Sequence, residues 1–192
     1  MISVVVLAAG KSSRMQGSNK LLATIEGQPL IRKVVQTTLE SKADEVIIVV
    51  GWEAEKIRAA LVGLPCRIAH NRNHEHGQSS SVKVGLRDIS QSARAVLILP
   101  GDVALIDARS INIVIEKYDL GRWKIVIAGH QGKSGHPILF DKQLFPEIER
   151  INEETFGLKA VVKKHESESC LVETGSPGVL RDFDTPEDFR QL

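Results

Sequence analysis

The sequence predicts a three-layer α/β/α domain built around a mostly parallel sheet. Two observations indicate this class. Short, continuous apolar runs alternate along the chain with stretches that carry apolar residues at helical spacing, the order of elements typical of α/β domains. The first run, residues 2–9, has the β-branched composition of a strand covered on both faces. The length of 192 residues suits one domain, so we expect residues 1–192 to form a single domain.

The expected elements follow in a regular order. Apolar runs bounded by glycine or polar residues predict strands at 2–9, 45–51, 66–69, 95–99, 124–128 and 170–173. Helical spacing of apolar residues predicts helices at 29–42, 53–61, 79–89, 107–117, 141–151 and 158–164, with a last helix after Thr185. Residues 135–137 are predicted to form a turn. Gly10, Gly51 and Asp102 each follow a strand, so they should gather at the sheet edge where such folds bind ligands.

Composition excludes several classes of protein. Lys and Arg total 25 and Asp and Glu total 24, and the net charge of +1 predicts neither nucleic acid nor an anionic membrane as a partner. Cys66 and Cys170 lie far apart, which argues against a disulfide framework or a zinc cage and fits a reducing cytoplasm. The apolar N-terminus lacks a preceding basic region and is too short to span a bilayer, so a cytoplasmic location is expected.

The loop after the first strand gives the strongest local indication of a ligand-binding site. Gly10 and Gly17 let the backbone approach a ligand closely, and its N–H groups can form an anion-binding concavity. Arg14 and Lys20 can neutralise phosphate oxygens. The loop matches neither the P-loop nor the dinucleotide fingerprint. A solvated basic turn is the alternative interpretation.

Five segments then point to one family. The loop reads LAAGKSSRM at 7–15, followed by NKLL at 19–22, and the later segments are GQSSSVKVGL at 77–86, PGDVALI at 100–106, GHPILF at 135–140 and RDFDTPEDF at 181–189. In this order they resemble the MobA-like molybdenum cofactor nucleotidyltransferases. These proteins belong to the nucleotide-diphospho-sugar transferase superfamily, whose fold is Rossmann-like.

The resemblance implies a function and a set of residues. It implies transfer of CMP from CTP to the phosphate of a molybdopterin-type cofactor, with Mg²⁺ as cofactor, pyrophosphate as leaving group and a molybdoenzyme as a further partner that receives the product. It implies catalytic roles for Arg14, Lys20 and Asp102, and Mg²⁺ binding by Asp102 and Asp184. Contacts to the nucleotide or acceptor are implied for Leu7, Ala8, Ala9, Gly10, Lys20, Ser79, Ser81 and His136. The related guanylyltransferases carry glycine at the place of Ala9, which favours CTP over GTP.

The sequence departs from the family pattern at three places. Gln16 lengthens the phosphate loop by one residue, and Ala104 stands where proline is usual. The segment at 154–159 reads ETFGLK, so the usual acidic residue is missing and Lys159 replaces arginine. The departure at 154–159 concerns the acceptor more than the nucleotide, whereas Gln16 affects the reach of Lys20.

Several alternatives remain open from the residues alone. Asp184 is either a metal ligand or a helix cap, and Asp182, two residues away in an extended segment, should face the opposite way. His70, His74 and His76 are expected to line a pocket rather than to bind a transition metal. His136 is either an acceptor contact or a capped turn histidine. Alternative functions are a sugar- or alditol-phosphate nucleotidyltransferase, a molybdenum cofactor delivery protein and, less favoured, a glycosyltransferase.

Overall fold

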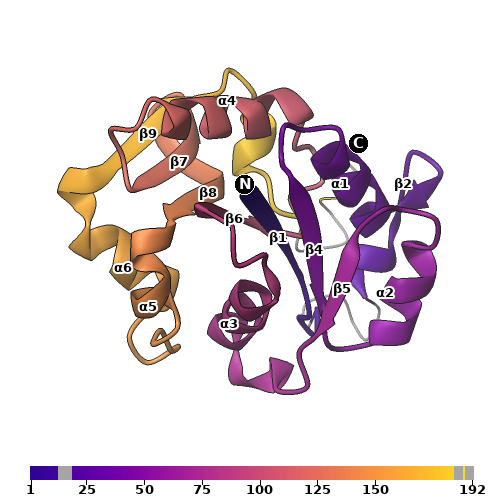
Figure 1. The fold of residues 1–192 in the computed structure, drawn as a ribbon. Helices are drawn as coiled ribbons and strands as arrows, with labels where there is room; N and C mark the ends of the chain where they lie inside the picture. The colour runs from indigo at the N-terminus through magenta and orange to yellow at the C-terminus, as the bar shows by residue number, and fades with distance from the viewer. Residues whose placement is uncertain (13–18, 184–187, 189–192) are drawn as a thin grey trace.

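A seven-stranded sheet runs through the centre of the computed structural model, which describes residues 1–12, 19–183 and 188 (Figure 1). The strand order is β5-β4-β1-β6-β8-β7-β9. The strands are β1 (Ile2–Ala8), β4 (Glu45–Val50), β5 (Arg67–His70), β6 (Ala95–Pro100), β7 (Ile125–His130), β8 (Lys133–Asp141) and β9 (Ser169–Glu173). A separate pair, β2 (Thr24–Ile25) and β3 (Gln28–Pro29), was not expected from the sequence.

The prediction of a mostly parallel sheet is confirmed. Strand β1 is parallel to both β4 and β6, β4 is parallel to β5, and β7 is parallel to β9. Only β8 runs against its neighbours β6 and β7 within this sheet. The carboxyl ends of β1, β4 and β6 therefore lie at one edge, which is where the predicted site residues fall.

The expected turn at residues 135–137 is wrong, because these residues belong to β8. The register between β7 and β8 shifts between Ile127 and Gly129, and the partners change from Ile138 to Ser134 across this irregularity. Pro137 lies in that irregular part, where its missing N–H costs no regular ladder bond. The real turn lies between β7 and β8, at Gln131 and Gly132.

Helices cover both faces of the sheet. The helices are α1 (Leu30–Leu39), α2 (Ala54–Ala60), α3 (Gln78–Asp88), α4 (Ala108–Asp119), α5 (Phe145–Ile148) and α6 (Leu158–Lys164). Short 3-10 turns are η1 (Lys20–Leu22), η2 (His74–His76), η3 (Lys142–Leu144), η4 (Glu166–Glu168) and η5 (Pro177–Leu180). The helix expected at 141–151 is thus divided into η3 and α5, and the helix expected after Thr185 lies outside the described residues apart from Asp188.

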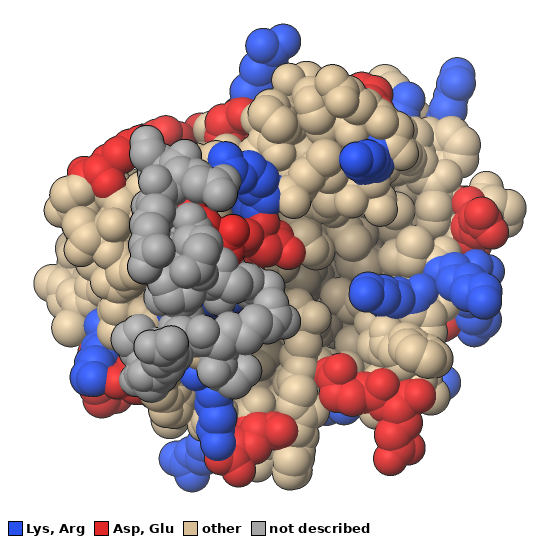
Figure 2. Space-filling model, turned by 180° about the vertical axis from the view of Figure 1, so that it is seen from behind, with Lys and Arg blue, Asp and Glu red and all other residues tan. Residues whose placement is uncertain are grey.

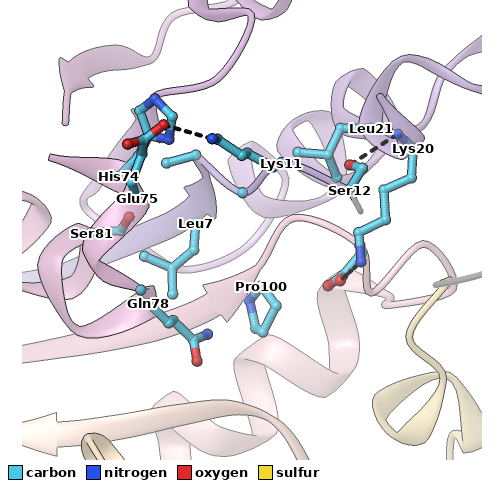
Figure 3. A pocket seen from close by; sticks show the side chains of 14 residues that line it. Leu7, Lys11, Ser12, Lys20, Leu21, His74, Glu75, Gln78, Ser81 and Pro100 are labelled. Carbon is cyan, nitrogen blue, oxygen red and sulfur yellow. Dashed lines mark hydrogen bonds and ion pairs between the residues drawn. The ribbon is translucent and has the colours of Figure 1, made fainter. Parts of the chain in front are cut away.

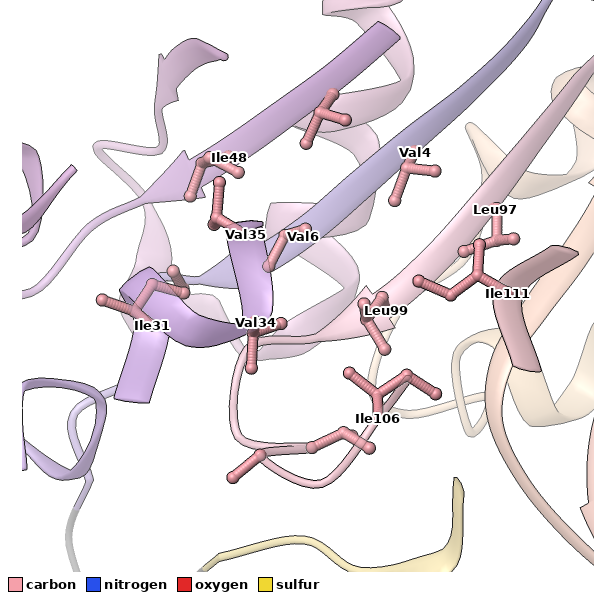
Figure 4. Packing of buried hydrophobic residues seen from close by; sticks show 14 of the residues in the cluster. Val4, Val6, Ile31, Val34, Val35, Ile48, Leu97, Leu99, Ile106 and Ile111 are labelled. Carbon is pink, nitrogen blue, oxygen red and sulfur yellow. The ribbon is translucent and has the colours of Figure 1, made fainter. Parts of the chain in front are cut away.

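The alternation of β1 divides the core into two layers. Val4 and Val6 lie in the cluster that contains the apolar residues of α1, α2 and α4, and Figure 4 shows Val34 and Val35 of α1 on this side. Val5 lies in the second cluster, with the apolar residues of α3, α5 and α6. Three layers, helix on sheet on helix, confirm the predicted architecture.

The surface carries both signs of charge. On the face seen in Figure 2, Lys and Arg are interspersed with Asp and Glu around a hollow with largely uncharged walls. In the described part of the chain, no helix is both long and apolar enough to span a bilayer.

Candidate active site

A cavity of about 420 Å³ lies at the carboxyl edge of the parallel strands (Figure 3). Predicted residues that line it are Leu7, Ala9, Gly10, Lys20, Ser81 and Asp102. The structure therefore brings together residues from the first strand, the loop after it, the start of α3 and the end of β6. Gathering at this edge follows from the parallel order β4-β1-β6.

Ala8 does not line this cavity, and its contact to the nucleotide or acceptor stays a prediction. Its side chain is buried in the core under α1, whereas Leu7 and Ala9 belong to the opposite layer and line the cavity. Successive side chains of a strand point to opposite faces, so three consecutive residues cannot all present side chains to one pocket.

Lys20 and Asp102 form the charged centre of this cavity. The two side chains make an ion pair through the Lys20 ammonium and Oδ2 of Asp102, and they are only 15% and 17% exposed. Asn19 begins the short η1 turn by accepting a hydrogen bond from the N–H of Leu21 at 3.1 Å, which places Lys20 at the start of that turn. The other carboxylate oxygen of Asp102, Oδ1, is buried and has no hydrogen-bond partner among the described residues.

Gly101 lets the chain after β6 lie close to the end of β1, directly before Asp102. A side chain at this position would come within 2.9 Å of the backbone oxygen of Leu7, so only glycine fits between β6 and the end of β1. The N–H of Gly101 also donates to that oxygen at 2.9 Å. Asp102 is therefore held by backbone contacts at the mouth of the phosphate loop.

The start of α3 closes the cavity on the other side. Ser81 is buried, and its hydroxyl accepts a hydrogen bond from the side-chain amide of Asn71 at 3.0 Å. Ser79 lines a different cavity, and its N–H donates to the Glu153 carboxylate at 2.6 Å. The two predicted serines thus serve two neighbouring cavities.

The second cavity is larger, about 1350 Å³, and it adjoins the first. Gln78, Pro100 and Asp102 line both cavities, so the Asp102 carboxylate stands where they meet. The other residues that line the larger cavity include His136, Glu153, Phe156, Lys159 and Asp182. Two of these residues were singled out from the sequence. Asp182 is exposed, and Lys159 lies in the first turn of α6.

His136 is positioned by the irregular part of β8. Burial lowers the pKa of this histidine below its ordinary value of 6.5, although the Asp102 carboxylate acts in the opposite direction. Its ring is therefore neutral near pH 7. Nδ1 of His136 is buried and has no hydrogen-bond partner among the described residues, so it can donate to or accept from a bound molecule.

The histidine cluster contributes one residue to the smaller cavity. His74 lines it, but His70 and His76 do not. Gly51 makes room for His74, because a side chain there would lie 2.6 Å from the His74 Cβ. Within residues 1–12, 19–183 and 188, no group of three or more His, Cys, Asp or Glu side chains could hold a metal ion.

Several lining residues were not anticipated, among them Lys11, Glu75 and Glu153. Lys11 and Glu75 form an ion pair of 2.6 Å at the mouth of the smaller cavity, seen as a dashed line in Figure 3. Glu153 caps α3 from a distant loop. Lys11 belongs to the basic loop at 11–20, so the composition of that loop could have indicated it, but no local pattern marks a carboxylate such as Glu153 that arrives from more than seventy residues away.

Several positions that were singled out from the sequence lie outside the described residues. They are Arg14, Gln16, Gly17, Asp184 and Thr185. The roles of Arg14 in catalysis and of Asp184 in metal binding therefore stay predictions, as does the effect of Gln16 on the loop. The N–H of Phe183 donates to the backbone oxygen of Asp102 at 3.0 Å, so the residue before Asp184 is adjacent to the charged centre.

Comparison with known proteins gives one family. The profile of the MobA-like NTP transferase domain matches residues 4–169. The purine catabolism protein PucB of Bacillus subtilis (strain 168) is 26% identical over 195 residues, which cover 96% of this chain and 92% of that protein. The bifunctional protein GlmU of Anaeromyxobacter sp. (strain Fw109-5) is 35% identical over 119 residues, covering 59% of this chain. The match spans only 24% of that relative's length.

Solved structures share the fold. A nucleotidyl transferase from Methanothermobacter thermautotroptrophicus, Mth528, superposes with a TM-score of 0.86 at 22% identity, over 100% of this chain and 95% of that chain. At this identity, the likeness concerns the fold. It agrees with the predicted nucleotide-diphospho-sugar transferase architecture.

Proposed function

This chain belongs to the MobA-like NTP transferase family, and from that premise we propose that it is a nucleotidyltransferase acting as one domain over residues 1–192. The proposed reaction transfers CMP from CTP to the phosphate of a molybdopterin-type cofactor and releases pyrophosphate. The observation that carries the proposal is the place of Asp102, at the junction of a smaller and a larger cavity. Two substrates, one in each cavity, would meet there.

The smaller cavity is proposed to hold the nucleotide. Lys20 and Lys11 supply cations for a triphosphate, with Arg14 as a further predicted donor. Ala9 lines this cavity, and its methyl group narrows the space for a base compared with glycine. Pocket size of this kind discriminates between nucleotides by about 10–200-fold, which favours CTP over GTP.

A divalent cation suits the charged centre. The free Oδ1 of Asp102 is an oxygen ligand of the kind that Mg²⁺ prefers, and Asp184 is the proposed second ligand. When bound, Mg²⁺ would neutralise charge between the acceptor phosphate and the α-phosphate. The Lys20 ammonium pairs with Oδ2 of Asp102. When a nucleotide binds, we expect this ammonium to pair with a phosphate oxygen instead.

The proposed mechanism needs little covalent chemistry from the protein. An oxygen of the acceptor phosphate attacks the α-phosphorus and forms a new P–O bond. The bond from the α-phosphorus to the oxygen bridging to the β-phosphorus breaks, and pyrophosphate leaves. The acceptor phosphate is already a nucleophile, so positioning and charge stabilisation are the main tasks of Lys20, Asp102 and the neutral His136.

Two rival functions are less well supported. A sugar- or alditol-phosphate acceptor has little apolar surface to set against Ile127, Ile138 and Leu158, which line the larger cavity together with polar residues. A protein that delivers the cofactor to a molybdoenzyme has no need for an ion pair of Lys20 and Asp102 at a cavity junction.

The test is a product assay. The protein is incubated with Mg²⁺, each of the four NTPs and either purified molybdopterin cofactor or a hexose 1-phosphate, and products are identified by mass. We expect a cytosine dinucleotide cofactor, and we expect Asp102→Asn to lower kcat by about 100-fold or more. Asp119→Asn, at a surface ion pair on α4, is the matched control and should keep full activity. Absence of product from every pair, or an unaffected Asp102→Asn, would overturn the proposal.

A further inference from the structure

The larger cavity presents an exposed aromatic side chain. Phe156 is 78% exposed and Leu171 is 39% exposed, and both line this cavity. The other large apolar side chains that are this exposed in the described chain, Met1, Val62 and Leu120, line neither cavity. An exposed phenyl ring at a cavity offers apolar surface that a ligand can bury.

Phe156 sits on a well-anchored loop. Its backbone has φ +61°, a conformation that aromatic residues seldom adopt, and its N–H donates to the oxygen of Glu153 at 3.1 Å. Glu153 is tied in turn to α3 through Ser79, and the N–H of Gly157 donates to Asn152 at 2.9 Å. These bonds hold the ring at the cavity without burying it in the core.

The rest of the cavity combines apolar and charged side chains. Ile127, Ile138 and Leu158 supply apolar walls, Lys159 and Lys163 add positive charge, and Glu166 and Asp182 add negative charge. The Glu153 carboxylate is already engaged by the N–H of Ser79. The chemistry that fits is a molecule with a flat apolar part and a phosphate, its phosphate directed to the junction at Asp102.

We infer that Phe156 is a specificity-determining residue that stacks on a planar heteroaromatic ring of the acceptor. This inference rests on the proposed function, because the larger cavity is the proposed acceptor site. Stacking of a ring on an aromatic side chain typically contributes enough that removing the side chain weakens binding by about 10-fold or more. The acceptor is then a phosphate with a heteroaromatic ring, and a polyol phosphate would gain less from Phe156 because it has no ring to stack.

The experiment measures binding separately from turnover. A fluorescent pterin monophosphate and glucose 1-phosphate are each titrated into the wild type, Phe156→Ala, Phe156→Leu and Phe156→Tyr. Loss of about 10-fold in pterin phosphate affinity is expected for the Ala and Leu variants, and Phe156→Tyr should bind as the wild type does. The Leu variant keeps apolar bulk but lacks a ring, so it separates stacking from simple burial. Leu120→Ala, at an exposed apolar residue that lines neither cavity, is the matched control.

The outcomes distinguish this inference from the proposed function. If pterin phosphate binds equally to the wild type and to Phe156→Leu, or if glucose 1-phosphate binds the wild type more tightly, the stacking role is wrong. If stacking is observed but no NTP yields a product, the proposed transferase reaction fails while the ring-binding site stands. With molybdopterin and CTP, Phe156→Ala should raise KM for the acceptor about 10-fold and leave KM for CTP unchanged.

Discussion

At the scale of single residues, the site is organised by an ion pair between two groups with different proposed ligands. Lys20 is proposed to bind phosphate and Asp102 to bind a cation. Without ligands, the two side chains form an ion pair with each other in a largely buried position. Because each charge has a partner of opposite sign, neither charged group is left unpaired next to the core, which would destabilise the fold. Substrate binding is then expected to replace this ion pair by two others, one between Lys20 and a phosphate and one between Asp102 and a cation.

Removing Lys20 should therefore have two opposite effects. Lys20→Ala is expected to weaken NTP binding by about 10-fold or more, because a charge-assisted contact to phosphate is lost. In the nucleotide-free protein the same variant should bind Mg²⁺ more tightly, because Asp102 no longer has Lys20 as a competing cation. Calorimetric titration measures both, with Lys33→Ala, at an exposed pair with Glu26, as control. Unchanged NTP affinity would mean that Lys20 does not reach the triphosphate.

The residues at the junction could be foreseen for a definite reason. Lys20 and Asp102 follow β1 and β6, and adjacent parallel strands must end at the same edge of the sheet. Glu153 and Phe156 follow no strand and carry no local signal of their role. Their positions depend on how the loop before α6 packs against α3, which is a tertiary contact that spacing in the sequence does not encode.

At the scale of elements, the prediction failed where β8 was taken for a turn. The run at 138–140 is apolar enough for a strand, but Pro137 argues against a central strand in a regular ladder. The ladder irregularity beside Gly129 removes that objection, and it cannot be read from one strand alone. His136 lies in the same irregular part of β8 and lines the larger cavity, so the missed strand and the position of this histidine have one cause.

A histidine between two carboxylates joins α5 to η4 at the end of α6. His165 contacts Glu147 through Nε2 at 3.0 Å and Glu168 through Nδ1 at 2.7 Å. Hydrogen bonds to Glu147 and Glu168 raise the pKa of His165 above its ordinary 6.5. The bond to His165 lowers the pKa of Glu147 below 4.5, and Lys124 followed by His165 lowers that of Glu168. Lys164 also faces Glu147.

The pH dependence of stability follows from these directions. The stabilisation by His165 is complete below pH 6.5 and is lost as the pH rises through its raised pKa, while that of the carboxylates is lost as the pH falls through their lowered pKa values. His165→Gln should therefore lower Tm by about 1–3 °C near pH ~5.5 and by less near pH ~8.5. Thermal melts at both values, with His70→Gln on β5 as control, check this. An equal loss at both pH values would contradict a charged His165.

At the scale of the whole molecule, an early and a late segment of the described chain meet at the candidate active site. Strand β1, which lies between β4 and β6, leads into the phosphate loop, and η5 packs against β7 and β8 before the chain reaches Asp102. Phe183 is fully buried in the same layer as α1 and α4. The order of motifs in the sequence could indicate that the C-terminal segment returns to the site, but not the backbone contacts that hold it there.

Those contacts make glycine necessary at Gly178. A methyl group there would overlap the backbone oxygen of Leu105, in the loop that follows Asp102, and backbone cannot move aside as a flexible side chain can. Gly178→Ala is therefore expected to displace the segment that ends at Phe183, to cost about 1–3 kcal/mol of stability and to lower kcat. Gly175→Ala is the control, because nothing lies within 4 Å of its added methyl and only its φ of +78° opposes the change. That backbone cost is about 1–2 kcal/mol.

Hydrogen exchange separates the two variants even before the acceptor is known. The N–H of Phe183 donates to the backbone oxygen of Asp102, so its exchange reports whether the C-terminal segment remains at the site. Gly178→Ala should speed exchange in a peptide covering residues 177–183 and lower kcat together. Gly175→Ala should lower Tm alone, with kcat and Phe183 exchange unchanged. If both variants lose stability equally and keep full turnover, the C-terminal segment supports the fold but does not help to hold Asp102 for catalysis.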